Sequence, residues 1–442
     1  MARPRKNAAK AQGSLLTPDE VVEIPVEEQP YPLPEGWKWV RLGSVLSASK
    51  EKTEDFSSPS LRYVGLEHLE KDNGITGFAS AEGVRSLKNI FRSGQILYGK
   101  LRPYLNKHDI ANFEGICSTD ILVFNCLTGT NNKFINYFFN LNHFKEYVGA
   151  NSKGINLPRV SEQIVLNAVF PLPPLDEQQR VVDRIESLFA KLDEAREKAK
   201  AVLNGFESRK AAILHKAFTG ELTEKWRKEK NISLESWDSC RLISVLKEKP
   251  RNGYSPKPVE CKTNVKSMTL SATTSGFFRP EFFKYIDEEI PENSHLWLSQ
   301  GDILIQRANS LEKVGTSAIY TGEDHEFIYP DLIMKLQVRA PHSYKYIAYI
   351  LSTQPTLNYF RAKATGTAGN MPKINQQIVS NTPIVVPSCE EQNEIVRILD
   401  GLLAKDQQVR DAAESVLERI DLMKKSILAK AFRGELTGQV HK

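Results

Sequence analysis

The chain has 442 residues, of which 40% are apolar and 26% are charged. This length exceeds what one hydrophobic core usually supports, so the composition predicts a globular protein of two or three domains. The formal net charge of +5 tolerates an anionic partner without requiring one, and no apolar run approaches the ~18 residues of a membrane span.

The five cysteines are scattered along the chain and form no CxxC pair. This pattern is typical of reduced thiols and not of disulfides or a zinc site, so we expect no metal and a cytoplasmic location.

Residues 1–30 are interpreted as a flexible N-terminal arm. MARPRKNAAK is basic and DEVVEIPVEEQP is acidic and rich in prolines, and neither stretch supports a packed core. Such an arm either orders against a partner or remains disordered.

Residues 31–174 and 231–387 each mix short β-like runs with turn signals. ILVFNC (121–126), DILIQ (302–306) and LIMKLQV (332–338) are typical of strands. KFINYFFNLNHFKEYV (133–148) and YKYIAYILSTQPTLNYF (344–360) have helical periodicity and occupy similar places in the two blocks. Both blocks are therefore predicted to be α+β domains, with the strand order left open.

Each block is followed by a helical segment, 175–230 in the first case and 388–442 in the second. Apolar residues recur there at alternating steps of four and three, prolines precede both stripes, and Gly220 and Gly434 follow them. We predict one helix of about 40 residues in each segment, with Arg209 and Asp406 as the polar interruptions of the two stripes. The predicted coiled-coil seam consists of Val181, Ile185, Leu188, Leu192, Val202, Phe206, Ile213, Ile395, Leu399, Leu402, Val409, Val416, Ile420 and Ile427.

The chain is a tandem duplication. KAFTGELT (216–223) returns as KAFRGELT (430–437), and residues 177–223 align with 391–437 without a gap and with 20 of 47 positions identical. The alignment continues upstream at the same offset of 214, where LPRV (157–160) aligns with MPKI (371–374). The fronts of the copies match at an offset of 200 (Trp37 with Trp237), and the middle matches faintly at 207 (Gly94 with Gly301).

Two loops in each block concentrate Arg, Lys, Asn and Ser, the side chains that reach phosphates and base edges. They are YGKLRPYLNK (98–107) and NSKGIN (151–156) in the first block, and IQRANSLEKVG (305–315) and ATGTAGNMPK (364–373) in the second. Their composition alone also fits ordinary solvated loops.

Motifs for catalysis are missing from the sequence. It contains no GxxxxGK[ST] loop, no HExxH and no N/D-P-P-Y/F tetrapeptide of the kind that holds a flipped adenine. Asp331 with Lys335 only faintly suggests a nuclease pair, because the intervening Glu is absent. We therefore expect no active site.

PLPEGWKWVRLG (32–43), PLPPLDEQQRVVDRIESLFAKLD (171–193) and the two GELT endings closely resemble the specificity (S) subunit of type I restriction–modification systems, over residues 31–438. The resemblance implies two target recognition domains, each reading one half of a bipartite, asymmetric DNA site. It also implies that the two helices pair as an antiparallel coiled coil with pseudo-two-fold symmetry, which fixes the spacer between the half-sites.

The implied partners are double-stranded DNA, two modification (M) subunits and, where present, restriction (R) subunits, with no membrane. The chain would be non-catalytic and bind no cofactor itself, since S-adenosylmethionine belongs to M, and ATP with Mg to R. By position in the loops, the candidate DNA-binding residues are Lys100, Arg102, Tyr104, Lys107, Lys153, Arg307, Asn309, Ser310, Lys313 and Lys373. Two rival interpretations are a coiled-coil scaffold that does not bind DNA and a nuclease or methyltransferase fusion.

Overall fold

The computed structural model describes residues 21–58, 60–71, 74–127, 129–154, 156–366 and 371–437, and the chain divides into two compact units. Unit 1 combines residues 1–199 with residues 415–442, and unit 2 comprises residues 200–414. Residues 1–20 of the expected arm lie outside the described residues. Residues 21–30 pack on the rest of unit 1: Val21 and Ile24 are buried, and the backbone NH of Ile24 donates to Trp39 O at 2.9 Å.

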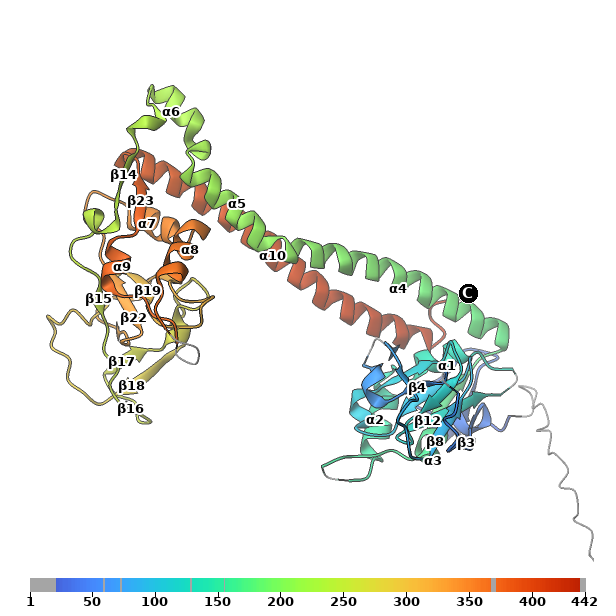
Figure 1. Ribbon diagram of the computed structural model, residues 1–442. Helices are drawn as coiled ribbons and strands as arrows, with labels where there is room; N and C mark the ends of the chain where they lie inside the picture. Colours follow the sequence, from blue (N-terminus) through green and yellow to red (C-terminus); the bar gives the residue numbers. More distant parts are fainter. Residues whose placement is uncertain are drawn as a thin grey trace, which may run out of the picture. The chain divides into compact units, whose positions relative to one another are not determined.

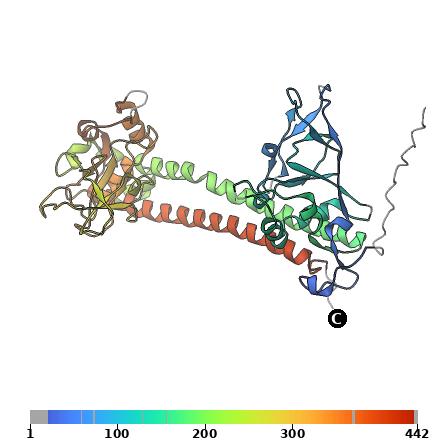
Figure 2. The same cartoon turned by 90° about the horizontal axis from the view of Figure 1, so that it is seen from below.

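Two sheets form the framework of the described part of unit 1 (Figure 1). The antiparallel four-stranded sheet has the spatial order β10 (His108–Ile110), β9 (Ile96–Gly99), β12 (Ile121–Cys126), β2 (Leu46–Ala48). The five-stranded sheet has the order β3 (Lys52–Thr53), β8 (Lys88–Phe91), β11 (Gly115–Cys117), β4 (Arg62–Val64), β7 (Ala79–Ser80), and its β11–β4 pair is parallel. Two further pairs are β1 (Lys38–Arg41) with β13 (Val169–Leu172), and β5 (Leu69–Glu70) with β6 (Gly74–Ile75). Figure 2 shows the strands of this unit extending away from the ends of the long helices.

Three short helices complete the block. They are α1 (Asn132–Phe138), α2 (Asn142–Ala150) and α3 (Glu162–Leu166). The side chain of Asn131 accepts hydrogen bonds from two backbone NH groups of α1, and Ser161 does the same for one NH of α3. Capping by Asn and Ser satisfies amides that have no partner inside a helix, so these residues fix where α1 and α3 begin.

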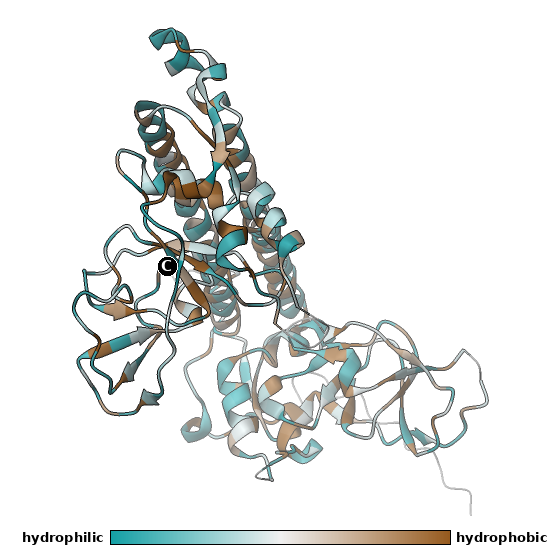
Figure 3. Cartoon of the chain, turned by 60° about the vertical axis from the view of Figure 1, so that its left-hand side comes forward, coloured by the Kyte–Doolittle hydropathy of each residue, from teal (hydrophilic) through white to brown (hydrophobic). Residues whose placement is uncertain are grey.

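Unit 2 repeats this plan. Its four-stranded sheet has the order β15 (Arg251–Asn252), β22 (Ile333–Leu336), β19 (Ile303–Gln306), β20 (Ser317–Ile319), and its second sheet the order β16 (Pro258–Val259), β18 (Phe283–Ile286), β17 (Val265–Met268), β21 (Phe327–Ile328). β14 (Asp238–Arg241) pairs with β23 (Pro383–Val386) as β1 does with β13. The helices are α7 (Tyr344–Leu351), α8 (Gln354–Lys363) and α9 (Gln376–Ser380). In both units the loops are mainly hydrophilic, whereas strands and helices carry apolar segments (Figure 3).

The long helices differ in one respect from the prediction. The second copy forms one continuous helix, α10 (Cys389–Ala431, 43 residues), as expected. The first copy is divided into α4 (Leu175–Asn204) and α5 (Phe206–Phe218) at Gly205. A glycine inside a helix is about 1 kcal/mol less favourable than alanine, and the equivalent position of α10 holds Arg419, so only the first copy is interrupted. A further helix, α6 (Glu224–Lys230), follows α5.

Within unit 1, ion pairs show that α4 and α10 run in opposite directions. Lys424 Nζ lies 2.6 Å from Asp193 Oδ1, and Arg196 pairs with Asp421. Arg196 follows Asp193 in α4, whereas its partner Asp421 precedes Lys424 in α10, so the two helices are antiparallel. The predicted antiparallel pairing is confirmed in this unit.

Within unit 2, the two polar interruptions of the apolar stripes meet each other. Arg209 Nε donates to Asp406 Oδ1 at 2.7 Å. The same carboxylate side chain is mostly buried, and Arg209 Nη1 also donates to Val202 O at 3.0 Å. Two positions that break the pattern in the sequence therefore compensate each other in the helix pair.

The predicted seam residues are not equally buried. Val181, Ile185, Ile395, Leu399 and Ile420 are buried, and Leu188, Leu192, Val202, Phe206, Ile213, Leu402 and Ile427 are half-buried. Val409 and Val416 are exposed and therefore lie outside the buried part of the seam.

The repeated helix ends complete the hydrophobic cores. In unit 1, Phe432 at the end of the second copy packs against Phe134 of α1, with ring centroids 4.6 Å apart. In unit 2, Phe218 at the end of the first copy packs against Tyr346 of α7 at 5.4 Å. Each helix end therefore packs into the core of the α+β block that belongs to the other repeat.

The repeated GELT sequence has the same role in both units. Thr223 Oγ1 donates to Glu391 Oε1 at 2.7 Å, and Thr437 Oγ1 donates to the equivalent Glu177. Glu391 is fully buried and also accepts hydrogen bonds from Arg227 Nη1 at 2.7 Å and Trp237 Nε1 at 2.9 Å. Each copy of the octapeptide therefore links the end of one long helix to the start of the other through a hydrogen bond between its Thr and a Glu.

Candidate nucleic-acid interface

The first candidate loop of unit 1 connects β9 to β10. Its centre is a short 3-10 helix, Pro103–Leu105, flanked by Arg102 (φ 52°) and Asn106 (φ 46°) in the left-handed region. This conformation costs roughly 1–2 kcal/mol for a residue with a Cβ atom and persists only where the surroundings enforce it. Here Pro103 is buried and the Asn106 side chain is bonded to His108 at 3.1 Å, so the loop has a defined shape.

The second candidate loop, which follows α2, is hydrogen-bonded to the first. The backbone NH of Arg102 donates to Pro158 O at 2.8 Å, and Val160 NH donates to Lys100 O at 3.0 Å. Lys153 and Arg159 close the second loop as an antiparallel bridge. Residues 100–107 and 151–159, without residue 155, therefore form one structure, which we call the first platform.

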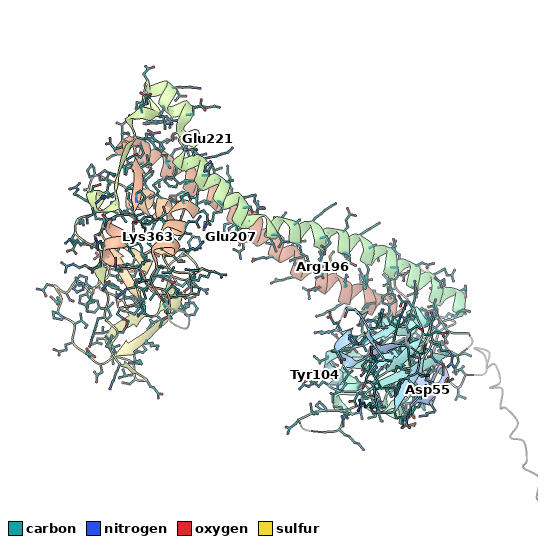
Figure 4. The ribbon with its side chains drawn as sticks, in the orientation of Figure 1. Asp55, Tyr104, Arg196, Glu207, Glu221 and Lys363 are labelled. Carbon is teal, nitrogen blue, oxygen red and sulfur yellow. The ribbon has the colours of Figure 1, made fainter. Side chains whose placement is uncertain are left out.

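The predicted residues of the first platform differ in how they are used. Lys100 Nζ donates to Thr119 O and Lys107 Nζ to Leu66 O, both at 2.7 Å, so these two ammonium groups hold neighbouring loops. Burial lowers the pKa of Lys100, an effect that nearby Asp120 partly offsets. Arg102, Tyr104 and Lys153 are exposed and form no side-chain hydrogen bond with the described residues. Figure 4 shows Tyr104 at the surface of the unit.

Unit 2 contains the same hydrogen-bond pattern between different residues. Asn309 NH donates to Pro372 O at 3.4 Å, and Ile374 NH donates to Arg307 O at 2.8 Å, which are the counterparts of the Arg102 and Val160 bonds. Thr365 and Lys373 form the antiparallel bridge. Residues 307–313 and 364–373, without residues 367–370, are called the second platform.

Side chains of the second platform are also of two kinds. Arg307 Nη1 donates to Asp331 O at 3.3 Å, which corresponds to the internal role of Lys100, and Asn309 Nδ2 donates to Gln306 Oε1 at 2.7 Å. Ser310, Lys313 and Lys373 are exposed. The structure thus brings the candidates of each unit together on one platform, but it directs Lys100, Lys107 and Arg307 largely inward.

Arg159 is a candidate that the sequence reasoning missed. It is the repeat equivalent of Lys373 and is largely exposed. Its Nη2 atom lies 3.6 Å from Asp120 Oδ1. The repeat alignment contained the signal, since LPRV (157–160) and MPKI (371–374) place a basic residue at the same position.

Asp331 and Lys335, which faintly suggest a nuclease pair in the sequence, contact different partners in the structure. Lys335 is buried, donates to Trp297 O at 2.7 Å and faces Asp302 at 3.6 Å. Asp331 instead accepts a hydrogen bond from Ser255 Oγ at 2.5 Å. Both residues therefore stabilise unit 2 through separate partners.

Among the described residues, no group of three or more His, Cys, Asp or Glu side chains is placed to hold a metal ion. No described helix is both long and apolar enough to span a membrane.

Comparison with known proteins is consistent with the duplicated architecture. A family described as type I restriction modification DNA specificity domain matches residues 34–204 and again residues 235–416. The type I restriction enzyme EcoKI specificity subunit of Escherichia coli (strain K12) is 28% identical over 69% of this chain and 66% of its own length. The StySPI specificity subunit of Salmonella potsdam is 23% identical over 92% of this chain and 90% of its own.

The matches to the first curated relatives span between half and two thirds of their length. The fold is shared with the HsdS subunit from Thermoanaerobacter tengcongensis, with a TM-score of 0.61 and 22% identity over 92% of this chain and all of that one. Since the family model matches once in each repeat and covers most of the sequence, the chain belongs to the type I restriction modification DNA specificity domain family.

Proposed function

We propose that this chain is the DNA-reading specificity subunit of a type I restriction–modification complex, in which each platform reads one half of a bipartite site. The observation that carries the proposal is that one hydrogen-bonded pair of loops occurs in both units with different exposed side chains. A shared backbone with changed side chains is what two readers of unlike half-sites require.

The exposed cations supply the contact to the DNA backbone. Arg102, Lys153 and Arg159 belong to the first platform, and Lys313 and Lys373 belong to the second. Phosphate contacts fix the register of a protein on duplex DNA, whereas contacts to base edges determine sequence preference. Arg159 and Lys373 occupy equivalent positions, which favours a phosphate contact common to both units.

Sequence preference would come from the positions at which the platforms differ. Arg102 is exposed and suits guanine, whereas Asn309 at the equivalent place is held by Gln306 Oε1, so the two platforms present different groups to a base there. The two half-sites should therefore differ, and the full site should be asymmetric.

The paired helices would determine the spacer and carry the partner subunits. α10 has 43 residues and hence a length of ~65 Å, which is about two turns of duplex DNA. We assign adenine methylation, with S-adenosylmethionine, to two M subunits docked on this frame, and ATP-dependent activity to R subunits. Methylation requires a flipped base, which M would extract while this chain holds the register.

The proposal is tested by DNA binding of the full chain with its M subunits. The target is first obtained by mapping methylated adenines, and binding is then measured between ~50 and ~200 mM salt against a scrambled duplex. Arg159→Ala and Lys373→Ala should each lower affinity about 5-fold at ~150 mM salt and reduce the salt slope by about 0.9.

Matched controls remove an exposed lysine outside the platforms, Lys191→Ala on α4 and Lys228→Ala on α6, and should leave both quantities unchanged. If the platform variants bind like the controls, the platforms are not the DNA-reading surface. If the wild-type complex does not distinguish the mapped site from the scrambled duplex, the chain is a scaffold and not a reader.

A further inference from the structure

Each platform exposes two large apolar side chains. Tyr104 is 59% exposed and Leu157 is 48% exposed on the first platform. On the second, Leu311 is 53% exposed and Met371 is 46% exposed. Figure 4 places Tyr104 on the outside of unit 1, where the loop that follows α2 also projects.

These four residues occupy two equivalent positions. Tyr104 lies two residues after Arg102, and Leu311 lies two residues after Asn309, whose backbone NH groups make the corresponding hydrogen bonds. Leu157 and Met371 directly precede Pro158 and Pro372, which accept those bonds.

A single exposed apolar residue needs no explanation, because much of any protein surface is apolar. Here the exposure recurs at both positions of two diverged domains, although the residue type has changed from Tyr to Leu and from Leu to Met. The charge at a neighbouring polar position changed, since Arg102 corresponds to Asn309. Apolar exposure is therefore a property of the platform.

The backbone presents the first of the two positions rigidly. Tyr104 stands in the short helix between the left-handed residues Arg102 and Asn106. Leu311 stands in a turn in which Lys313 NH and Val314 NH both donate to Ser310 O at 2.9 Å, and Arg361 Nη2 fixes the same turn by donating to Glu312 O at 2.9 Å. Because the backbone is already ordered, little further conformational entropy of the loop is lost when the side chain inserts into a ligand.

We propose that Tyr104 and Leu311 are wedge residues that insert between neighbouring base pairs of their half-sites, with Leu157 and Met371 packing beside them. The inference rests on the proposed function and deepens it. Apolar wedges partly unstack a base step and bend the duplex, and the loss of stacking is offset by burial of the wedge and by closer contact with the surrounding cations. Arg159 and Lys373 are placed to supply that contact.

The test uses the mapped DNA site with the fluorescent base 2-aminopurine placed singly along each half-site, away from the methylated adenines. Unstacking raises the fluorescence of this base. The wild-type complex should give one enhanced step in each half-site. Tyr104→Ala should abolish the enhancement in one half-site only, and Leu311→Ala in the other half-site only, with affinity lowered roughly 10-fold in each case.

Two sets of controls separate a wedge from other roles. Tyr104→Phe and Leu311→Met should keep both enhancement and affinity, because the wedge needs an apolar body and not the hydroxyl group. Arg159→Ala and Lys373→Ala should weaken binding but keep the full enhancement when the protein is saturating. All these side chains are exposed, so thermal unfolding should match that of the wild type.

The wedge is overturned if Tyr104→Ala and Leu311→Ala keep the fluorescence steps. It is also overturned if they impair assembly with M subunits and leave DNA binding intact, which would make the apolar pairs a protein interface. Specific DNA binding by the wild type without any enhanced step refutes the wedge alone, whereas absence of specific binding refutes the proposed function.

Discussion

Replacement of Phe432 by alanine should destabilise unit 1, although this residue lies near the end of the chain. The side chain is fully buried, and its ring centroid is 4.6 Å from that of Phe134 and 5.8 Å from that of Phe138. Loss of buried apolar surface contributes about 2–3 kcal/mol, and a residual cavity of ~100 Å³ contributes about 2 kcal/mol. Phe→Ala changes in cores therefore cost about 3–5 kcal/mol, a large part of the ~5–15 kcal/mol that stabilises a domain.

Hydrogen exchange of the full chain, followed by mass spectrometry, localises the effect. Phe432→Ala should speed exchange in α1, β9 and β12 of unit 1 and leave β19 and β22 of unit 2 unchanged. Phe218→Ala is the matched variant, because Phe218 is the repeat equivalent and packs on Tyr346 in unit 2. It should speed exchange in unit 2 only, and by less, since Phe218 is half-buried. Unchanged exchange in unit 1 of Phe432→Ala, or equally faster exchange in both units of either variant, would show that these phenylalanines do not complete separate cores.

The remaining predictions concern charge. Arg227→Ala leaves the fully buried Glu391 carboxylate without its cation and should lower unfolding free energy by about 3–5 kcal/mol, measured by urea denaturation. Arg180→Ala, which removes the ion pairs of a 62% exposed side chain with Asp176 and Glu177 in unit 1, should cost less than about 1 kcal/mol, and equal losses would contradict this ranking. Burial lowers the pKa of His108 in the folded state, so protons bind preferentially to the unfolded chain, and unit 1 should lose stability as pH falls below ~6.5. His108→Gln should reduce this loss without abolishing it, because burial also lowers the pKa of His143; an unchanged pH profile would exclude His108 as a contributor.

Periodicity and the repeat were enough to predict the long helices and the two α+β blocks. The apolar stripe of α10 and the terminal Gly434, which adopts φ 77°, are local features with a direct structural meaning. The break at Gly205 was not predicted, because the apolar stripe continues across it and only the low helix propensity of glycine opposes the pattern.

The sequence did not predict which distant residues contact each other. Arg209 and Asp406 each looked like a defect in a stripe, and only the antiparallel register shows that they neutralise each other. In the same way, nothing in the sequence indicates that Phe432 and its neighbours Leu428 and Ala431 complete a core whose other buried members precede residue 190, since that depends on the tertiary course of the chain.

The candidate loops were predicted from composition, but the direction of each side chain was not. Lys100 and Lys107 have the same chemistry as Lys153, but their ammonium groups donate hydrogen bonds to backbone carbonyls of neighbouring loops. Arg159 was detectable from the repeat register, whereas the exposed Leu311 was not, because a leucine in a loop is expected to be buried. Burial of a loop residue is decided by contacts distant in sequence, which periodicity does not report.

The central claim is that two units of one fold read two halves of one DNA site. Its most direct test is the map of methylated adenines in cells that express the chain with its M subunits, compared with cells in which residues 31–170 are replaced by those of another family member. We expect a split motif in which the exchange alters one half and preserves the other half and the spacer. A continuous motif, or a change in both halves, would contradict it.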